Sequence, residues 1–389
     1  MQFQAAVARG ATLEEIEKGL VSQVGSGPGG SVDLAVLFVS AQLRFVASDL
    51  ARRLRAALQP GVLLGVSAEG VIGGDQEVEN EPAASLLLGH LPGVTLQPFA
   101  VPAADWDELV RDDERLHQRL GTGEAHRAQL LLADPFHPGI IESLPQLDAV
   151  LGAPTLGGMA SASHRPEGNV LLLNDRVLLD GAVGVGLGGA LQVDPVVAQG
   201  CRPVGEPMVV TASQGPWVLQ LRRQPALAVA QQILSGLPQA DMELIQQNGL
   251  FVGVVLHEEQ AEFHRGDFLV RGLLGANREN EALAVGEYVR PGQTIQFHVR
   301  DAAAAHEDLV ELLRRREPSG PPAGALLFSC NGRGSRMFSQ PHHDIRTTRD
   351  VFPGLPVAGF FAMGELGPVG GRTFVHGHTA SLALFRSPA

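Results

Sequence analysis

The residue types best suited to chemistry lie in one turn at the end of an expected strand, Phe328-Ser-Cys330-Asn331-Gly332-Arg333-Gly334-Ser335. Its two glycines let backbone N–H groups point inward, and Arg333 adds a fork of donors that suits a carboxylate or a phosphate. We therefore expect this loop to contact a ligand. Cys330 has two interpretations, a nucleophile activated by a base and positive surroundings, or a small buried residue that ends a strand.

An acidic residue, Glu365, follows a second apolar strand directly, in the turn Met363-Gly364-Glu365-Leu366. An acid at such a position either caps the next element or binds a cationic group. A ligand resembling an amino acid needs one partner for its carboxylate and one for its ammonium group. Arg333 and Glu365 are the candidates for these two roles.

Histidines near the C-terminus invite a metal interpretation, because His342 and His343 precede Asp344, and His376 and His378 follow later. Nitrogen and carboxylate ligands suit zinc or iron. Adjacent histidines rarely aim at one ion, however, so structural or ligand-contact roles are favoured and no metal site is expected. If His376 and His378 lie on one strand, they share a face.

Motifs of known enzyme classes are missing: the sequence has no G-x-S-x-G elbow, P-loop or H-E-x-x-H. The glycines from Gly184 to Gly189 match G-x-G-x-x-G, but Pro195 follows where a dinucleotide site needs a helix. A glycine-rich strand packed closely on a neighbour is expected instead. No cofactor and no catalysis are expected, and an enzyme is kept as an alternative.

Composition narrows the class of protein. The chain has 389 residues and a net charge of −13, which disfavours a general nucleic-acid-binding role. The basic run Arg314 to Arg316 is expected at a helix C-terminus. Two cysteines indicate no disulfide framework, no stretch reads as a membrane span, and the N-terminus does not resemble a signal peptide. We expect a cytoplasmic protein that does not insert into membranes.

Helices are expected where caps and periodic apolar residues coincide. Thr12 and Glu15 form a capping box, and further helices are expected around residues 46–58, 225–236 and 301–313. In the turn-forming stretch 200–207, Arg202 and Glu206 are expected to pair with each other. Short apolar runs predict strands at residues 34–39, 62–66, 130–133, 170–173, 183–187, 251–256, 295–299, 326–329 and 357–361.

An internal repeat connects these elements. The stretches 33–74 and 324–371 both read strand, polar turn, helix, strand, glycine, acid, and a weaker third unit covers residues 129–163. We therefore expect an α/β or α+β fold of repeated β-α-β units, with mixed sheets covered by helices and two related halves. Ligands of such sheets bind at strand ends, where the repeat places Ser40, Glu69, Asp134, Cys330 and Glu365.

Several long stretches closely resemble the FIST family, named for F-box and intracellular signal transduction proteins. They are residues 200–211, 269–275, 297–302, 326–338 and 359–382. The resemblance implies a FIST N-terminal domain over residues 1–215 and a FIST C-terminal domain over 216–389. It also implies a sensory domain for small molecules such as amino acids, and it supplies the motif positions Cys330, Asn331, Arg333, Asp344, Gly364, Glu365 and His376.

Three functions follow as hypotheses. The first is a small-molecule sensor in signal transduction, with ligand contacts at those motif positions and Gly332, and with a signalling protein as a further partner. The second is an enzyme that uses Cys330 or a histidine-based site. The third is a protein-interaction scaffold, as in relatives that carry an F-box. No F-box-like, kinase or cyclase segment is expected, because the FIST regions occupy the chain.

Overall fold

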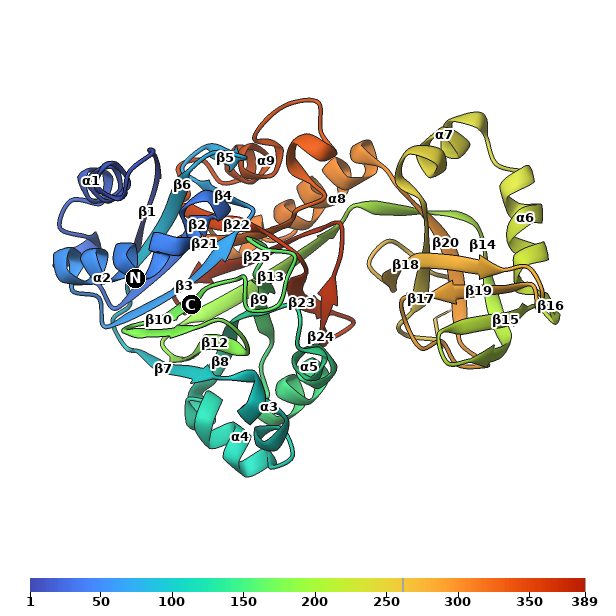
Figure 1. The fold of residues 1–389 in the computed structure, drawn as a ribbon, viewed down its shortest axis with the longest axis horizontal. Coiled ribbons are helices and arrows are strands. Elements are labelled where there is room, and N and C mark those ends of the chain that lie inside the picture. The colour runs from blue at the N-terminus through green and yellow to red at the C-terminus, as the bar shows by residue number, and fades with distance from the viewer. Residues whose placement is uncertain (261, 389) are drawn as a thin grey trace. The chain divides into compact units, whose positions relative to one another are not determined.

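The computed structural model describes residues 1–260 and 262–388, and the chain forms two compact units (Figure 1). The first unit combines residues 1–197, 309–375 and the segment from Thr379 onward. The second unit combines residues 198–308 and 376–378. Both units therefore draw on segments that are far apart in the sequence. Each unit is described here by itself.

Three repeats of one strand pattern build the first unit. The first repeat contains β1 (Gln2–Arg9), β2 (Leu34–Ser40), β3 (Val62–Ala68), β4 (Gly70–Gly73), β5 (Gln76–Glu79) and β6 (Ala83–His90). The second contains β7 (Val94–Val101), β8 (His126–Ala133), β9 (Thr155–Met159), β10 (Leu171–Leu173), β11 (Arg176–Leu178) and β12 (Ala182–Gly189). The third contains β13 (Gln192–Gln199), β21 (Gly324–Cys330), β22 (Val357–Ala362), β23 (Glu365–Val369), β24 (Arg372–His376) and β25 (Thr379–Arg386).

The sheets have matching orders, β1-β6-β2-β3-β10-β11, β7-β12-β8-β9-β23-β24 and β13-β25-β21-β22-β4-β5. In each repeat one parallel pair (β2 with β3, β8 with β9, β21 with β22) flanks a helix, as the expected β-α-β units require. Each sheet also receives a hairpin from another repeat, in a closed cycle. The expectation of two related halves is therefore corrected to three repeats, because the weak third unit is a complete one.

Three equivalent glycines permit close pairing of the parallel strands beside each exchanged hairpin. Gly65, Gly157 and Gly359 lie opposite residues of β10, β23 and β4, respectively. A Cβ atom on Gly157 or Gly359 would lie 1.9 or 1.8 Å from a carbonyl oxygen of the neighbouring parallel strand. No side chain fits at that distance. The backbones can therefore approach only because these positions are glycine.

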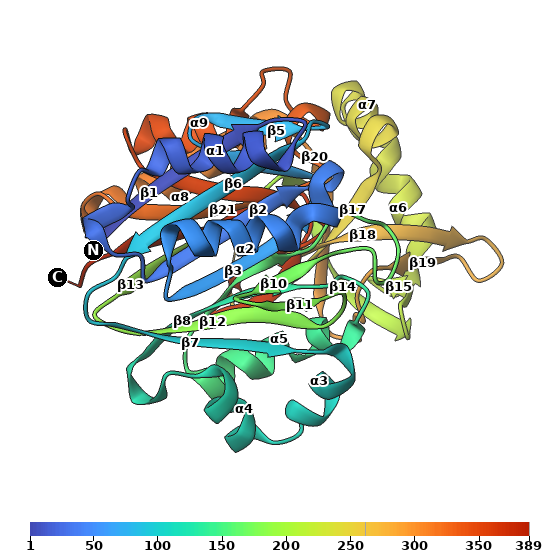
Figure 2. The same ribbon diagram turned by 60° about the vertical axis from the view of Figure 1, so that its left-hand side comes forward.

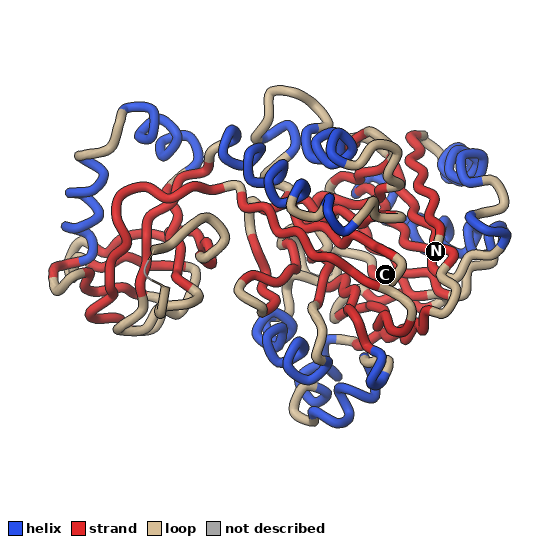
Figure 3. The backbone as a smooth tube through the Cα atoms, turned by 180° about the vertical axis from the view of Figure 1, so that it is seen from behind, coloured by secondary structure: helices blue, strands red, loops and turns tan. Residues whose placement is uncertain are grey.

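Helices cover the outer faces of the sheets (Figures 2 and 3). They are α1 (Leu13–Val24), α2 (Ala47–Leu58), α3 (Ala103–Leu109), α4 (Asp113–Leu120), α5 (Pro138–Leu151), α8 (Ala302–Arg314) and α9 (His343–Val351). Figure 2 shows α1 and α2 side by side. The predicted capping box at Thr12 and Glu15 is confirmed, and Leu50 and Leu54 of α2 are buried as their spacing predicts.

An apolar core lies between the sheets. It contains residues of all three repeats, and the ring of Phe38 stacks on Phe360 at 5.1 Å between centroids. The glycine-rich segment at Gly184 is confirmed as part of strand β12. A Cβ atom there would lie 2.3 Å from a backbone oxygen of β8, so close strand packing explains the glycines.

The second unit is a closed six-stranded barrel with one added strand. Its elements are β14 (Cys201–Gln214), β15 (Trp217–Leu221), β16 (Gln224–Pro225), β17 (Leu250–Val255), β18 (Phe268–Asn277), β19 (Ala282–Val285), β20 (Thr294–Arg300), α6 (Ala226–Ser235) and α7 (Gln239–Asn248). The order β14-β20-β17-β18-β19-β15 closes through the pairing of β14 with β15. Closure removes the free edges of the sheet.

Two local expectations for the barrel are corrected. The stretch 200–207 is mostly strand rather than turn, with a bulge between Val204 and Met208 that holds Gly205 at φ 67°. Arg202 does not pair with Glu206; it binds Asp301 at 2.7 Å and also Asp241. The two acids belong to α7 and to the start of α8. The partners of Arg202 therefore come from segments that are distant in sequence and meet only in the folded barrel.

The predicted boundary between residues 215 and 216 falls in the hairpin turn that joins β14 to β15. It describes sequence domains and stays a prediction. The compact units divide the chain elsewhere, since the barrel is inserted between β13 and α8 of the third repeat.

Candidate functional site

The second strands of the three β-α-β units converge at their carboxyl ends. The hydroxyl of Ser161, just after β9, donates to the carbonyl of Phe361 in β22 and accepts the amide of Glu69, just after β3, at 2.8 Å. One side chain therefore ties together the ends of β9, β22 and β3. Polar groups placed at these ends by the repeat can act on a common region, as is usual for ligand sites of such sheets.

A fully buried ion pair lies at the end of β21. The guanidinium of Arg333 donates from Nε and Nη2 to the two oxygens of Asp344, at 2.8 and 2.7 Å. The Ser329 hydroxyl donates to Asp344 at 2.7 Å. Arg333 is 0% exposed and Asp344 1%. A buried pair is stable only when both charges are satisfied, so this geometry fixes the turn against α9.

The imidazole ring of His343 contacts Asp344 and stacks on Phe338. His343 Nδ1 lies 2.9 Å from an Asp344 oxygen, and its ring stacks on Phe338 with centroids 3.4 Å apart. Burial by itself would raise the pKa of Asp344, but the charge and hydrogen bonds of Arg333 and His343 hold that pKa well below its usual range. Asp344 is therefore ionised at neutral pH and serves as the counter-ion of Arg333.

The hairpin of the first repeat, β4–β5, supplies two acids to this cluster. Glu77 accepts the amides of Asp344 and Ile345, at 2.8 and 3.0 Å, and so caps α9. Glu79 accepts the amide and hydroxyl of Ser335, at 2.9 and 2.8 Å. Burial, followed by the nearby charge of Asp344, raises the pKa of Glu77 to about 8.

The sequence analysis missed both of these acids. Glu77 and Glu79 lie more than 250 positions before their partners, and neither ends a strand of the recognised pattern. The sequence signal that could have revealed these acids was the repeat. Each β-α-β unit is followed by an equivalent hairpin that must pair with a strand, and the hairpin of the first repeat, β4–β5, pairs with β22.

Cys330 and Glu365 form the innermost part of the cluster. The Cys330 thiol donates to Asn331 Oδ1 at 3.8 Å and is also within hydrogen-bond reach of the Glu365 carboxyl group, and the Gly332 amide donates to the sulfur at 3.4 Å. Glu365 is 0% exposed and accepts the Thr379 amide through Oε2 at 3.2 Å. Burial raises the pKa of Glu365 well above its usual range. Cys330 is buried, with 7% of its surface exposed.

Most of the predicted site residues are brought together. The cluster contains Cys330, Asn331, Gly332, Arg333, Asp344, Gly364 and Glu365, where Gly364 contributes a carbonyl that accepts the Met159 amide at 2.8 Å. His376, the last residue of β24, belongs by its contacts to the barrel unit. His376 and His378 do not lie on one strand, so the shared face considered for them does not arise: β24 ends at His376, and His378 adopts φ 59°.

Over residues 1–260 and 262–388, no group of three or more His, Cys, Asp or Glu side chains has an arrangement that could hold a metal ion.

In the described part of the chain, no helix is both long and apolar enough to cross a membrane.

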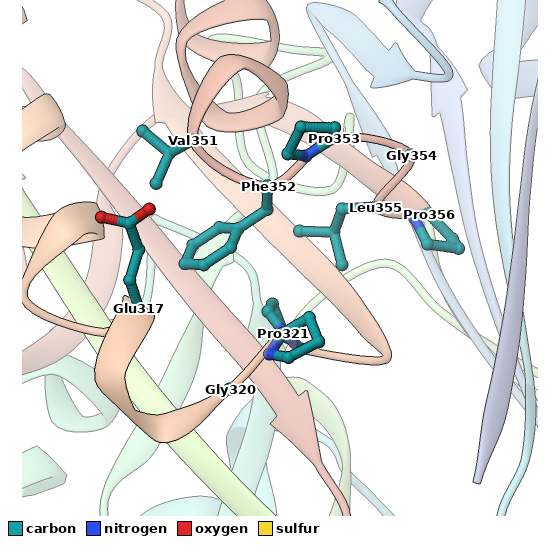
Figure 4. A pocket seen from close by; sticks show the side chains of 10 residues that line it. Glu317, Gly320, Pro321, Val351, Phe352, Pro353, Gly354, Leu355 and Pro356 are labelled. Carbon is teal, nitrogen blue, oxygen red and sulfur yellow. The ribbon is translucent and has the colours of Figure 1, made fainter.

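A surface hollow of about 320 Å³ lies at the opposite ends of β21 and β22, between the connections that lead into these strands (Figure 4). Figure 4 shows the ring of Phe352 between the side chains of Glu317 and Leu355. Four prolines and Gly320, Gly354 and Val351 complete the lining. The cluster residues are not part of this lining.

Comparison with known proteins identifies the family. A model of the FIST N domain matches residues 33–224, and a model of the FIST C domain matches residues 226–368. A protein of Mycobacterium tuberculosis, described as uncharacterized, is 42% identical over 367 residues, 92% of each chain. A second such protein, from Mycobacterium bovis, is 38% identical over 388 residues, 97% of this chain and 96% of its own. The resemblance found in the sequence is thereby confirmed.

Proposed function

Because the chain belongs to the FIST family, we propose that it is a cytoplasmic sensor that binds a small ligand at the strand-end cluster and signals to a partner protein. FIST domains are associated with signal transduction. The proposed ligand is an amino acid or a related small metabolite that carries an amino group.

One observation carries this proposal. Three buried carboxylate oxygens in the cluster have no hydrogen-bond partner among the residues that the structure describes: Oε2 of Glu69, Oε2 of Glu77 and Oε1 of Glu365. Buried polar atoms are almost always paired, so unpaired ones in one place indicate a missing donor. An ammonium group supplies three donors and a matching charge.

The balance of charges in the cluster supports a cationic group on the ligand. Five carboxyl groups face two guanidinium groups here: Glu69, Glu77, Glu79, Asp344 and Glu365 against Arg333 and Arg336. The excess of acid favours a ligand that brings positive charge, or protons, into the cluster.

The carboxylate and the amine of the ligand are assigned to different residues of the cluster. Arg333 uses two of its N–H groups on Asp344, so it positions the turn and adds charge at short range. Arg336 is more accessible, and it binds Glu69 and the carbonyl of Asn331. We therefore place the ligand carboxylate near Arg336 and the turn amides, and its amine toward Glu365.

A thermal-shift screen of the purified protein against amino acids, amines and organic acids tests the proposal. A ligand at 100 times its dissociation constant stabilises the folded state by about 2.7 kcal/mol. Glu365→Gln should weaken binding of the hit at least about tenfold, whereas Glu142→Gln, at an exposed site on α5, should not. A flat screen on ligand-free protein would favour an interaction scaffold, and equal affinities for both variants would refute the assigned site.

A further inference from the structure

We infer that Cys330 and Glu365 form a nucleophilic pair that captures a small carbonyl compound, of the aldehyde class, as a reversible covalent adduct. This activity goes beyond amine sensing. It uses the same cluster but does not depend on recognition of an amino group.

Three contacts prepare the sulfur of Cys330 for this role. The thiol donates to Asn331 Oδ1 at 3.8 Å and is also within hydrogen-bond reach of Glu365, which can take the proton, and the Gly332 amide donates to the sulfur at 3.4 Å. The positive charges of Arg333 and Arg336 also act on Cys330. An amide donor and positive charge both favour the thiolate, the reactive form of cysteine.

Glu365 is suited to exchange protons with a thiol. An ordinary carboxylate has a pKa near 4.3 and a thiol near 8.5, so it is about four units too weak a base. Burial raises the pKa of Glu365 and narrows this gap. Its second oxygen, Oε1, is buried and has no hydrogen-bond partner among the described residues. That oxygen is a geometric sign, separate from the raised pKa, that a hydrogen-bond donor is missing beside the sulfur.

The carbonyl class follows from the position of this acid. In molecules in which Glu365 is ionised, the Cys330 proton passes to this carboxylate as the sulfur adds to the carbonyl carbon, and the C=O π bond opens to an alkoxide. Glu365 then returns the proton to the alkoxide oxygen, which gives a hemithioacetal. The addition creates an oxyanion that needs a proton, and the protonated Glu365 beside the sulfur can supply it. The addition needs no oxidant and no leaving group.

The remaining charges around the pair define its pH behaviour. Arg333 and Arg336 favour the thiolate, Glu365 opposes it when ionised, and Asp344 offsets part of the charge of Arg333. Reactivity should therefore persist below the ordinary thiol pKa. The chain contains an internal comparison, since its other cysteine, Cys201, is buried in the barrel unit.

The test measures alkylation of both cysteines by iodoacetamide, resolved by peptide mass spectrometry, from pH 5.5 to 9. We expect Cys330 to react at least about tenfold faster than Cys201 at pH 7, with a rate that changes less than about twofold between pH 7 and 8, where an ordinary thiol with a pKa near 8.5 changes about eightfold. Glu365→Gln should lower the Cys330 rate about tenfold, and Glu142→Gln should not change it. The pH profile of Cys330 in the native protein, measured beside that of Cys201 as the internal reference, tests activation even if Glu365→Gln fails to fold.

Glycolaldehyde then probes the carbonyl class, with ethylene glycol as the matched unreactive compound. We expect glycolaldehyde to protect Cys330 from iodoacetamide, with recovery on dilution, and ethylene glycol to give no protection. An equal rate for the two cysteines, or an ordinary thiol pH profile, would overturn the nucleophilic pair. A reactive Cys330 that glycolaldehyde fails to protect would overturn the carbonyl assignment. Neither result depends on whether amino acids bind.

Discussion

Replacing Glu77 with glutamine should make the protein more stable at neutral and alkaline pH. Glutamine keeps the shape of the side chain and a carbonyl oxygen that can still accept the amides of Asp344 and Ile345. Glutamine cannot ionise, whereas the carboxyl group of Glu77 can. Burial, followed by the charge of Asp344, raises the pKa of that carboxyl group from 4.5 to about 8. The perturbation therefore isolates the cost of a second negative charge beside Asp344.

The direction and size follow from proton linkage. The folded state binds the Glu77 proton more tightly than the unfolded state does. The stability that Glu77 contributes in this way is therefore fully present below pH 4.5 and is lost as the pH rises to about 8. Each pH unit in that window costs about 1.4 kcal/mol at most, so the total reaches up to about 5 kcal/mol, and about 3 kcal/mol of it is lost by pH 7.

Urea denaturation of the wild type and Glu77→Gln at several pH values between 5 and 9 measures this loss. The difference in the free energy of unfolding should grow in favour of Glu77→Gln as the pH rises, and level off above about 8. Titrating groups that the two proteins share contribute equally to both free energies of unfolding, so they cancel in the difference. One of them is His298, whose pKa is lowered by burial to about 4. Glu142→Gln is the matched control. Parallel pH profiles for wild type and Glu77→Gln would refute the raised pKa and the crowding of charges that explains it.

Three further substitutions test other parts of the structure by urea denaturation. Arg333→Met should cost about 3 to 5 kcal/mol, because it leaves the buried charge of Asp344 unpaired; a loss under 1 kcal/mol would mean that water reaches this site. Gly359→Ala should cost at least about 1 to 3 kcal/mol, since its Cβ would collide with a backbone oxygen, whereas Gly275→Ala, with open space around it, should not. Thr12→Ala should cost about 1 kcal/mol through loss of the α1 cap, and an unchanged midpoint would argue against it.

Local sequence signals predicted the individual elements well. The capping box at Thr12 placed the start of α1, and apolar runs placed the central strands, because these signals depend on neighbours within a few residues. The parallel pairing of β21 with β22 also followed, since a β-α-β unit has one favoured geometry. The polar turn at Cys330 was found because it ends such a strand.

Pairings between distant segments could not be predicted in the same way. The exchange of hairpins among the repeats depends on surfaces that exist only after each unit has formed, so Glu77 gave no local sign of its role in capping α9. Likewise, Arg202 found Asp301 across a strand pairing rather than Glu206 four residues away. The barrel was missed because its closure joins β14 to β15 only once the other strands are in order.

The exchange of hairpins makes the candidate site a joint product of the two FIST regions. The FIST N region supplies Glu77 and Glu79, which hold the start of α9 and the turn at Ser335, and the FIST C region supplies both of those elements. Strand β4 also completes the edge of β22. A FIST C segment without the first repeat would therefore expose that edge, leave α9 without its cap and release the turn that carries Arg333. A signal that changes the protonation of Glu77 or the position of this turn acts on both regions at once, because neither can form the cluster alone.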